Sequence, residues 1–480
     1  MNYKMVFHII GRILLVEALL LAVPLAVSLI YREDILLAYV LPILLLIATG
    51  LVLGYKQPKN SAIYAKEGFF VVSLSWIVIS LFGALPFWLS GAIPSYLDSF
   101  FETVSGFTTT GASILAEVES LPMSLLFWRS FTHWVGGMGI LVFVLAILPK
   151  VETSSIYLMK AEVPGPQVGK LVSKTKLTAR ILYGIYIILT LIQILFLLAG
   201  GMPLFDSITN AFATAGTGGF SIKNASIGAY HSAYIDWIIT IFMILFGINF
   251  NLFYFVISGQ LIAALKSEEL RWYIGIIAGA ALLIAGNILP LYGNIGEALR
   301  HSSFQVASII TTTGFATVDF NTWPTFSKGL LVLLMFLGAC AGSTGGGLKI
   351  SRVVMLVKSA VRELRHYLNP RSVMSVKFEH KTVDSAVIGG VHLYFVIYAI
   401  LFVVSVFLMG LDQFDLITNF TSVASCINNV GPGLELVGPM GNYSAFSPLS
   451  KLLLSFDMLA GRLELIPMLI LFSSKIWKKG

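Results

Sequence analysis

The chain has 480 residues, of which 57% are hydrophobic and only 11% are charged. Soluble domains average about 45–50% apolar and about 25% charged residues, so these proportions and the mean hydropathy of +0.88 exclude an ordinary soluble protein. The net charge of +7 does not indicate a nucleic-acid surface, because the Lys and Arg residues fall in short loops between long apolar runs.

Ten apolar runs are long enough to cross a bilayer, which takes about 20 residues as a helix. From the N-terminus they are 7–30, 35–55, 67–90, 122–148, 178–200, 233–263, 272–291, 328–361, 386–409 and 448–472. The first run contains Arg12 and resembles a secretory signal, but no clear small-residue cleavage site follows and the second run comes at once. We therefore expect an all-α polytopic membrane protein whose first span is a retained anchor.

The basic residues sort to one side of this ten-span arrangement. That side holds Lys4, Lys56, Lys59, Lys66 and the basic residues of 150–180, 266–271, 349–381 and 475–479. The opposite loops hold only Arg32, Lys223, Arg300 and Lys328, against many acidic residues. By the positive-inside rule the basic side is cytoplasmic, which predicts a multi-pass protein of the inner membrane with both termini in the cytoplasm.

The eight spans after the first two form four pairs, and each pair encloses a short segment that ends in Gly and small or polar residues. Aligned by eye, the segments read ETVSGFTTTG (102–111), TNAFATAGTG (209–218), QVASIITTTG (305–314) and SVASCINNVG (422–431). Their closing glycines recur at intervals of 107, 96 and 117 residues. The sequence predicts a parallel unit of span, short segment and span that occurs four times.

Each segment is too short and too polar to span, although the flanking spans place both its ends on the outer face. Irregular backbone at membrane depth is tolerated only where protein buries it or water lines it, so we expect re-entrant loops, each a half-helix followed by an extended strip. Four strips around a central pseudo-fourfold axis would direct carbonyl and hydroxyl oxygens at a dehydrated cation, with the negative helix ends toward the same axis. The alternative is that the segments are ordinary extracellular turns, but this would not explain why four aligned copies occur.

The expected cation pathway uses the last three residues of each strip. These are Thr109, Thr110, Gly111, Gly216, Thr217, Gly218, Thr312, Thr313, Gly314, Asn429, Val430 and Gly431. Within this set the cation ligands are expected from Thr110, Gly111, Thr217, Gly218, Thr313, Gly314, Val430 and Gly431. The closing glycines permit backbone conformations that are closed to other residues. Only the first and third strips read Thr-Thr-Thr, so the ring should be approximately fourfold.

The strips and several further motifs resemble the Trk/Ktr superfamily of potassium transport proteins, and within it the TrkH type. The motifs are FWRSFTHWVGGMGI (127–140), KAEVPGP (160–166), FGINFNLFYF (246–255), GACAGSTGGGLKISR (338–352) and AGRLELIP (460–467). The resemblance runs from about residue 60 to the C-terminus, and the additional pair of spans before it separates the TrkH type from the shorter Ktr type. It implies potassium uptake by a homodimeric membrane subunit that a cytosolic nucleotide-binding subunit regulates.

The eighth span contains a glycine-rich stretch with Gly338, Gly342, Gly345, Gly346 and Gly347. Each Gly costs a helix up to about 1 kcal/mol relative to Ala, so the span should break between 338 and 347; close packing of small residues is the alternative. The stretch is a near miss for a phosphate-binding loop, because Leu348 intervenes before Lys349 and a span precedes it. The resemblance implies an intramembrane gating loop beneath the filter.

Arg462 lies within the tenth span, where a charge costs about 2.5–3.5 kcal/mol. A structural ion pair with Asp457 or Glu464 is one account of it. The resemblance implies another, in which Arg462 meets the glycine-rich loop under the filter and raises the barrier to cations when the gate is shut. A pair of Arg129 with Glu102 could similarly brace the first strip.

These expectations divide the chain into an N-terminal two-span anchor (1–58) and pore repeats at 59–150, 151–265, 266–382, with the broken second span, and 383–480. Acidic residues lie near the outer ends of the strips and should concentrate cations; they are Asp98, Glu117, Glu119, Asp412 and Glu435. The basic loops 150–180 and 349–381 would either dock a cytosolic protein or meet anionic membrane lipid.

No enzyme activity is expected, because the seven histidines show no metal-ligand spacing and no nucleophile, base and orienting group stand together. Cys340 and Cys426 are too few for a disulfide framework or a metal site and should be free and buried. No covalent cofactor is expected, only K⁺ ions in the filter. A proton- or sodium-coupled secondary transporter is the alternative function, for which Asp457 and Glu464 are titratable candidates.

Overall fold

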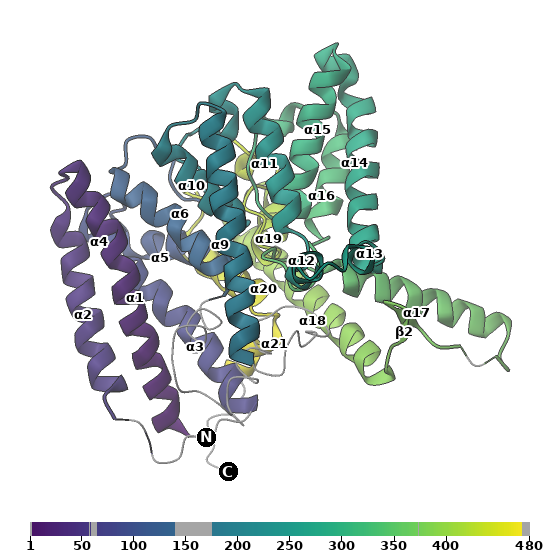
Figure 1. Cartoon of the computed structure of the whole chain (residues 1–480), viewed down its shortest axis with the longest axis horizontal. Helices are drawn as coiled ribbons and strands as arrows, with labels where there is room; N and C mark the ends of the chain where they lie inside the picture. The colour runs from purple at the N-terminus through teal and green to yellow at the C-terminus, as the bar shows by residue number, and fades with distance from the viewer. Residues whose placement is uncertain (1, 57, 59–64, 140–174, 373, 473–480) are drawn as a thin grey trace.

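The computed structural model describes the whole chain except residues 1, 57, 59–64, 140–174, 373 and 473–480. Six helices in this part are long and apolar enough to cross a membrane. They are α1 (Tyr3–Tyr31), α2 (Leu36–Gly54), α3 with α4 (Ala65–Gly83 and Leu85–Leu89), α9 (Thr175–Ala199), α14 (Glu268–Tyr292) and α18 (Ser385–Met409). Several of them run along the vertical of Figure 1, where α1 begins and α21 ends toward the same lower end. The expected all-α membrane architecture is confirmed.

Helices α1 and α2 pack on each other along one side of the molecule (Figure 1). Small residues allow their backbones to approach closely: a Cβ on Gly11 would lie 2.5 Å from Gly54 N and 2.9 Å from Gly50 O. α1 also packs on α3 and α6. The N-terminal pair is therefore attached to the elements of the first repeat.

Four short helices precede the four strips. They are α5 (Tyr96–Phe107), α10 (Leu204–Ala215), α15 (Ile295–Ile310) and α19 (Leu416–Ile427). A 12-residue helix such as α5 spans about 18 Å, less than the roughly 30 Å of a hydrocarbon core. The side chains of Ser95, Asn294 and Asp415 cap three of them by accepting hydrogen bonds from amides of the first turn. Each helix therefore stops partway, at the point where its strip begins.

The helices that follow the strips are also short, and this corrects the expectation of unbroken second spans in the second and fourth repeats. They are α6 (Met123–Gly137), α11 (Ala233–Phe246), α16 (Thr325–Met335) and α20 (Pro448–Arg462), with 15, 14, 11 and 15 residues. Only the eighth span was expected to break; it is non-helical from 336 to 349, and α17 (Ile350–Leu368) follows. The tenth is also interrupted before α21 (Ile466–Leu471). The end of the fourth expected span, 140–148, lies outside the described residues.

The expected span 233–263 is likewise wrong, because the chain turns by 94° between α11 and α12 (Phe250–Ile257). Gly247 is needed at this bend, since a Cβ there would lie 2.2 Å from the Tyr273 hydroxyl. Asn249 then caps α12, and the amide of Phe250 donates to Gly342 O at 3.0 Å. Tertiary contacts with the glycine-rich loop thus accompany a bend in the helix, although the sequence there is continuously apolar. The short α13 (Leu261–Leu265) follows α12.

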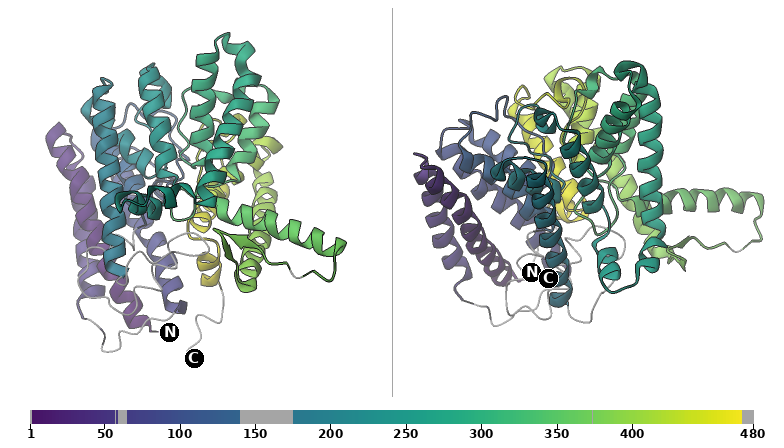
Figure 2. Two further views of the ribbon diagram at one scale, coloured as in Figure 1. Left: turned by 45° about the vertical axis from the view of Figure 1, so that its right-hand side comes forward. Right: turned by 45° about the horizontal axis from the view of Figure 1, so that its top comes forward.

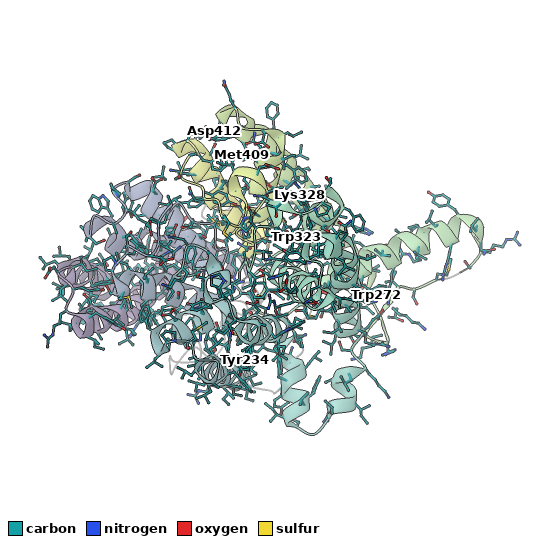
Figure 3. All side chains as sticks on the ribbon, turned by 90° about the horizontal axis from the view of Figure 1, so that it is seen from above. Tyr234, Trp272, Trp323, Lys328, Met409 and Asp412 are labelled. Atoms are coloured by element: carbon teal, nitrogen blue, oxygen red, sulfur yellow. The ribbon has the colours of Figure 1, made fainter. Side chains whose placement is uncertain are left out.

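Helix α17 projects from the side of the molecule, and the chain then returns to a small hairpin that lies beside the first half of α17 (Figures 1 and 2). The hairpin pairs β1 (Lys377–Phe378) with β2 (Lys381–Thr382) in antiparallel register. In the view from above, α17 extends outward past Trp272 of α14 (Figure 3). Within the described residues the remaining elements are short 3₁₀ helices, η1 (Ser226–Tyr230), η2 (Phe320–Thr322), η3 (Gly410–Asp412) and η4 (Glu435–Val437).

Buried apolar side chains form one large cluster that joins the N-terminal pair to the first and fourth repeats, and a second cluster that lies mainly in the third repeat and includes Val430 and Leu434 of the fourth. The first includes Trp76, Phe107, Trp128 and Met458, all at most 1% exposed. The five-part division of the chain stays a prediction.

Candidate functional site

The four strips carry the same backbone hydrogen bonds, which tie each strip to the end of its own short helix. In each, one amide donates to the carbonyl five residues earlier. These bonds join Thr110 to Ser105 (2.9 Å), Gly218 to Ala213 (2.8 Å), Thr313 to Ser308 (2.8 Å) and Val430 to Ser425 (2.9 Å). Because the N–H and the preceding C=O of a trans peptide point to opposite sides, the carbonyls before these amides point away from the helices.

The strips also share their backbone dihedral angles. φ is positive at Thr109 (54°), Thr217 (54°), Thr312 (59°) and Asn429 (55°), and again at Gly111 (80°), Gly219 (77°), Gly314 (81°) and Gly431 (99°). Glycine adopts this region freely, whereas threonine rarely does. A strained conformation repeated at four equivalent positions is a feature that the surrounding structure imposes.

This geometry corrects the register expected for the second strip. Gly219, not Gly218, matches Gly111 of the first strip, and Gly216 matches Thr108 rather than Thr109. The second triplet is therefore Thr217, Gly218 and Gly219. The sequence could not decide between two consecutive glycines, because only the hydrogen bond and the sign of φ distinguish them.

The four glycines close a ring in chain order. A Cβ on Gly111 would lie 2.0 Å from Gly218 O, one on Gly219 1.9 Å from Thr313 O, one on Gly314 2.2 Å from Val430 O, and one on Gly431 2.6 Å from Thr110 O. Each glycine thus lies against the carbonyl that precedes the glycine of the next strip. Any side chain at these positions would collide with backbone.

The side chains of the strips divide into two groups. The hydroxyls of Thr108 and Thr110 bond each other (2.8 Å), and the Asn429 amide donates to Thr110 Oγ1 (2.9 Å), so the first and fourth strips are joined. Thr109 Oγ1 and Asn429 Oδ1 are buried and have no hydrogen-bond partner among the described residues. Together with the carbonyls, these oxygens are of the kind that replace the hydration shell of a cation.

The glycine-rich loop 336–349 lies against one end of the ring. The amide of Gly346 donates to Thr312 Oγ1 at 2.8 Å, and a Cβ on Gly345 would lie 3.1 Å from Thr311 O. All five glycines expected in the gate belong to this loop, and φ is 70° at Gly342 and 65° at Gly347. The loop therefore covers the ring where its strips leave the short helices.

Arg462 is 8% exposed and reaches the same loop from the end of α20. Its guanidinium donates to Thr344 O (2.7 Å) in the loop and to Gly136 O (2.6 Å) and Gly137 O (2.8 Å) at the end of α6. The nearby acids are engaged elsewhere, since Glu464 pairs with Arg352 and Asp457 accepts from Ser405 (3.0 Å). The structure thus joins Arg462 to backbone carbonyls of two repeats.

A sequence profile of the TrkH family, described as a cation transport protein, matches residues 37–274 and 280–479. The chain belongs to the TrkH family. It is 36% identical to the Trk system potassium uptake proteins TrkH of Salmonella typhimurium, over 487 residues, and of Escherichia coli, over 486 residues. Each alignment covers 100% of both chains. These relatives are named as transporters and not as enzymes.

The fold agrees with the crystal structure of the potassium transporter TrkH from Vibrio parahaemolyticus. The TM-score is 0.90 at 32% identity, and the match covers 100% of each chain. With its long apolar helices, this member of the TrkH family is an integral membrane protein.

In this TrkH-family protein a buried ion pair supports the first strip. Glu102 of α5 accepts hydrogen bonds from Arg129 Nε (2.8 Å), Ser113 Oγ (2.9 Å) and the amide of Ile114 (3.0 Å). Arg129 also donates to Ser221 O (3.1 Å), beyond the second strip. The pair thus connects the segments that follow the first two ring glycines.

Sequence reasoning missed His133, which is fully buried on α6 one turn after Arg129. Nδ1 lies 2.7 Å from Gly106 O, and Nε2 accepts from the amide of Phe220 at 3.1 Å. The imidazole of His133 also lies directly behind Gly218, because a Cβ built on Gly218 would be 2.3 Å from it. The spacing of four residues from Arg129, which puts both on one helix face, was the available signal.

An open cavity of about 140 Å³ faces the other end of the ring. Its lining includes Gly111, Gly219, Gly314, Gly431, Arg129 and Lys223. Glu119 pairs with Lys223 at 3.3 Å. Hydrogen bonds from the Asn224 amide and from Lys223 hold the pKa of Glu119 below its ordinary value, so this rim carboxylate is charged at neutral pH.

The other expected acidic residues are less directly placed at the cavity. Asp98 pairs with Lys451 at 2.7 Å, and Asp412 accepts from the amide of Ser447 at 2.8 Å. Cys340 and Cys426 are free and buried, as expected. Within the described residues, no group of three His, Cys, Asp or Glu side chains could hold a metal ion.

Proposed function

We propose that this protein takes up potassium through a channel-like pore whose filter is the ring of four strips. The relatives named above are potassium uptake proteins, and the ring supplies the ligands that a dehydrated K⁺ requires. The filter residues are Thr109–Gly111, Thr217–Gly219, Thr312–Gly314 and Asn429–Gly431. The observation that carries the proposal is that each ring glycine packs directly against a backbone carbonyl of the next strip, so that the four strips form a closed ring.

The filter is tested by cation flux into proteoliposomes, with potassium, rubidium, sodium and lithium compared. Gly314→Ser should weaken the preference for potassium and rubidium, because a side chain there meets Val430 O at a φ of 81°. Gly329→Ser is the matched control, since Gly329 lies on α16 in the same repeat with nothing within 4 Å of its Cβ position. An unchanged ion preference in well-folded Gly314→Ser protein would remove the filter assignment.

The same assay separates the alternative function. A pore conducts down any potassium gradient, whereas a coupled transporter requires its driving ion. Uptake that depends on a proton or sodium gradient at fixed voltage would favour the secondary transporter over the pore.

The loop 336–349 and Arg462 act as the gate in this proposal. The loop covers one end of the filter, and Arg462 places a positive charge against it. A cation that leaves the filter on this side meets both, so conduction requires the loop and the guanidinium to move.

The proposal also includes the orientation of the protein in the membrane, its assembly as a homodimer and its regulatory partner. Basic residues of α17 and its hairpin lie on the side of the gate, which the positive-inside rule assigns to the cytoplasm of an inner-membrane protein, together with both termini. The family resemblance supports a homodimer and a cytosolic nucleotide-binding regulatory subunit. Native mass spectrometry would measure the dimer, and flux with and without the added subunit would measure the regulation.

A further inference from the structure

Lys349 is the last residue of the glycine-rich loop and is 1% exposed. Its ammonium donates hydrogen bonds to Gly345 O and to Gly346 O, the second at 3.1 Å. These two carbonyls belong to the part of the loop that contacts Thr311 and Thr312 of the third strip. A lysine side chain is thus folded back onto the loop directly beneath the filter.

This ammonium is not neutralised by an ion pair. Among the described residues no carboxylate oxygen lies within 4.0 Å of Lys349 Nζ. The acids in the neighbourhood are engaged elsewhere: Glu464 pairs with Arg352, and Glu269 accepts from the amides of Ala341 (2.7 Å) and Ser351 (3.1 Å). A buried charge without such a partner is costly unless other ligands replace its water.

The loop carbonyls supply those ligands, and they are of the type that K⁺ uses. Three successive carbonyls of the loop accept hydrogen bonds from positively charged side chains. Arg462 donates to Thr344 O, and Lys349 donates to Gly345 O and Gly346 O. An ammonium is a compact point charge on a flexible stem, so it can fill a site for a monovalent cation and can also leave it.

We infer that the Gly345 and Gly346 carbonyls form a cation site within the gate, which the Lys349 ammonium fills in the closed state and a permeating K⁺ uses when the lysine withdraws. Lys349 is a positioning residue that keeps the loop closed with its charge. This inference rests on the proposed gate and adds to it a second tethered cation and an ion site.

The flux test compares neutral and charged replacements in liposomes without any activator. Lys349→Met and Lys349→Gln should raise the unstimulated rubidium flux by about tenfold, whereas Lys349→Arg should stay near the parent level. Gln keeps a hydrogen-bond donor, so it separates the charge from a merely structural contact. Lys358→Gln, on α17 and paired with Glu268, is the matched control. Each variant is first checked for insertion and a single gel-filtration peak; if Lys349→Met misfolds, the Gln variant carries the test.

A second measurement addresses the ion site itself. Crystals of Lys349→Gln in rubidium should show an anomalous peak at the Gly345 and Gly346 carbonyls, which is absent from the parent protein. If the neutral variants show the same flux as the parent protein, or if the anomalous peak is missing, the inference is wrong. If Arg462→Ala raises flux while the Lys349 variants do not, the proposed gate stands and only the role of Lys349 fails. If neither raises flux although the filter is selective, the gate fails and the inference with it.

Discussion

In the proposed pore, individual residues act on the cation pathway through the backbone carbonyls that they expose or occupy. The ring glycines leave neighbouring carbonyls free of side chains, since a Cβ at any of them would lie within 2.6 Å of one. Arg462 does the opposite and occupies the carbonyls of Thr344, Gly136 and Gly137. In the proposed gate, opening therefore requires that the Arg462 guanidinium release these carbonyls.

Arg462→Ala should raise unstimulated potassium flux by about tenfold or more, because it removes both a positive charge and the bonds that join the loop to α6. The measurement is rubidium uptake into liposomes at matched protein density. Arg271→Ala on α14 is the control, since Arg271 is exposed and its hydrogen bonds within the described part of the chain go to the backbone of Ser267 and Lys266 just before the helix. A flux no higher than that of the control would argue against the gate.

At the scale of elements, the short helices hold the strips in register, and buried polar groups fix them to their neighbours. Glu102 and Arg129 connect α5 to α6. The position of Glu102 relative to the ring glycine is taken by Gln305 in the third repeat. The brace is therefore specific to the interface between the first two strips.

Glu102→Gln should lower the unfolding temperature in detergent and weaken ion selectivity. Removing one partner of a buried pair leaves the other charge uncompensated, which costs about 3–5 kcal/mol. Glu117→Gln, an exposed carboxylate in the same outer segment, should change neither property. Unchanged thermal stability of Glu102→Gln would show that the pair does not brace the strip.

Asp415 stabilises the start of α19 by accepting hydrogen bonds from the side chain and amide of Thr418 (2.5 and 2.9 Å). These bonds hold the pKa of Asp415 below its ordinary value. The folded state thus prefers the carboxylate, whose stabilisation is complete above the unfolded pKa of about 3.9 and is lost as the pH falls through the lowered folded value.

Asp415→Ala should lower stability by about 1 kcal/mol at neutral pH, while Asp415→Asn retains most of the cap. Thermal unfolding of the parent and both variants at several pH values checks this. The difference between the parent and the Ala variant should shrink in acid. A constant difference would mean that the carboxylate charge is not involved.

On the scale of the whole molecule, the ring lies between an open cavity, at which Lys223 pairs with Glu119, and the glycine-rich loop, to which Arg462 donates a hydrogen bond. Glu119 and Lys223 form an exposed pair at the rim, and such pairs contribute little to stability. Their charges act on ions in solution instead, over a range that salt controls.

Glu119→Gln should reduce potassium uptake severalfold at low ionic strength, because it leaves the Lys223 charge at the cavity without its partner. The defect should disappear at high salt, since the Debye length falls from about 30 Å at 0.01 M to about 3 Å at 1 M. Glu363→Gln breaks a comparable exposed pair with Arg362 on α17 and is the control. An equal defect at all salt concentrations would point to a local structural change.

Much of the architecture could be predicted from the sequence because it depends on local composition. Apolar runs of spanning length, the fourfold recurrence of short polar segments and the glycines of the first, third and fourth strips are all visible in the printed chain. The pairing of Glu102 with Arg129 was also anticipated. The sequence did not show the breaks in the sixth and tenth spans, since hydropathy alone cannot reveal contacts between distant residues.

The sequence by itself determined a membrane protein with four repeated half-helices and strips, because hydrophobic length and glycine placement are local properties. Only the tertiary structure decided that Gly219 completes the ring, that Arg462 bonds carbonyls instead of Asp457 or Glu464, and that His133 supports the second strip. Each of these depends on atoms from different repeats meeting at one axis. Residues 87 to 326 positions apart meet in that way through packing, and no pattern within a single segment specifies the distance between them.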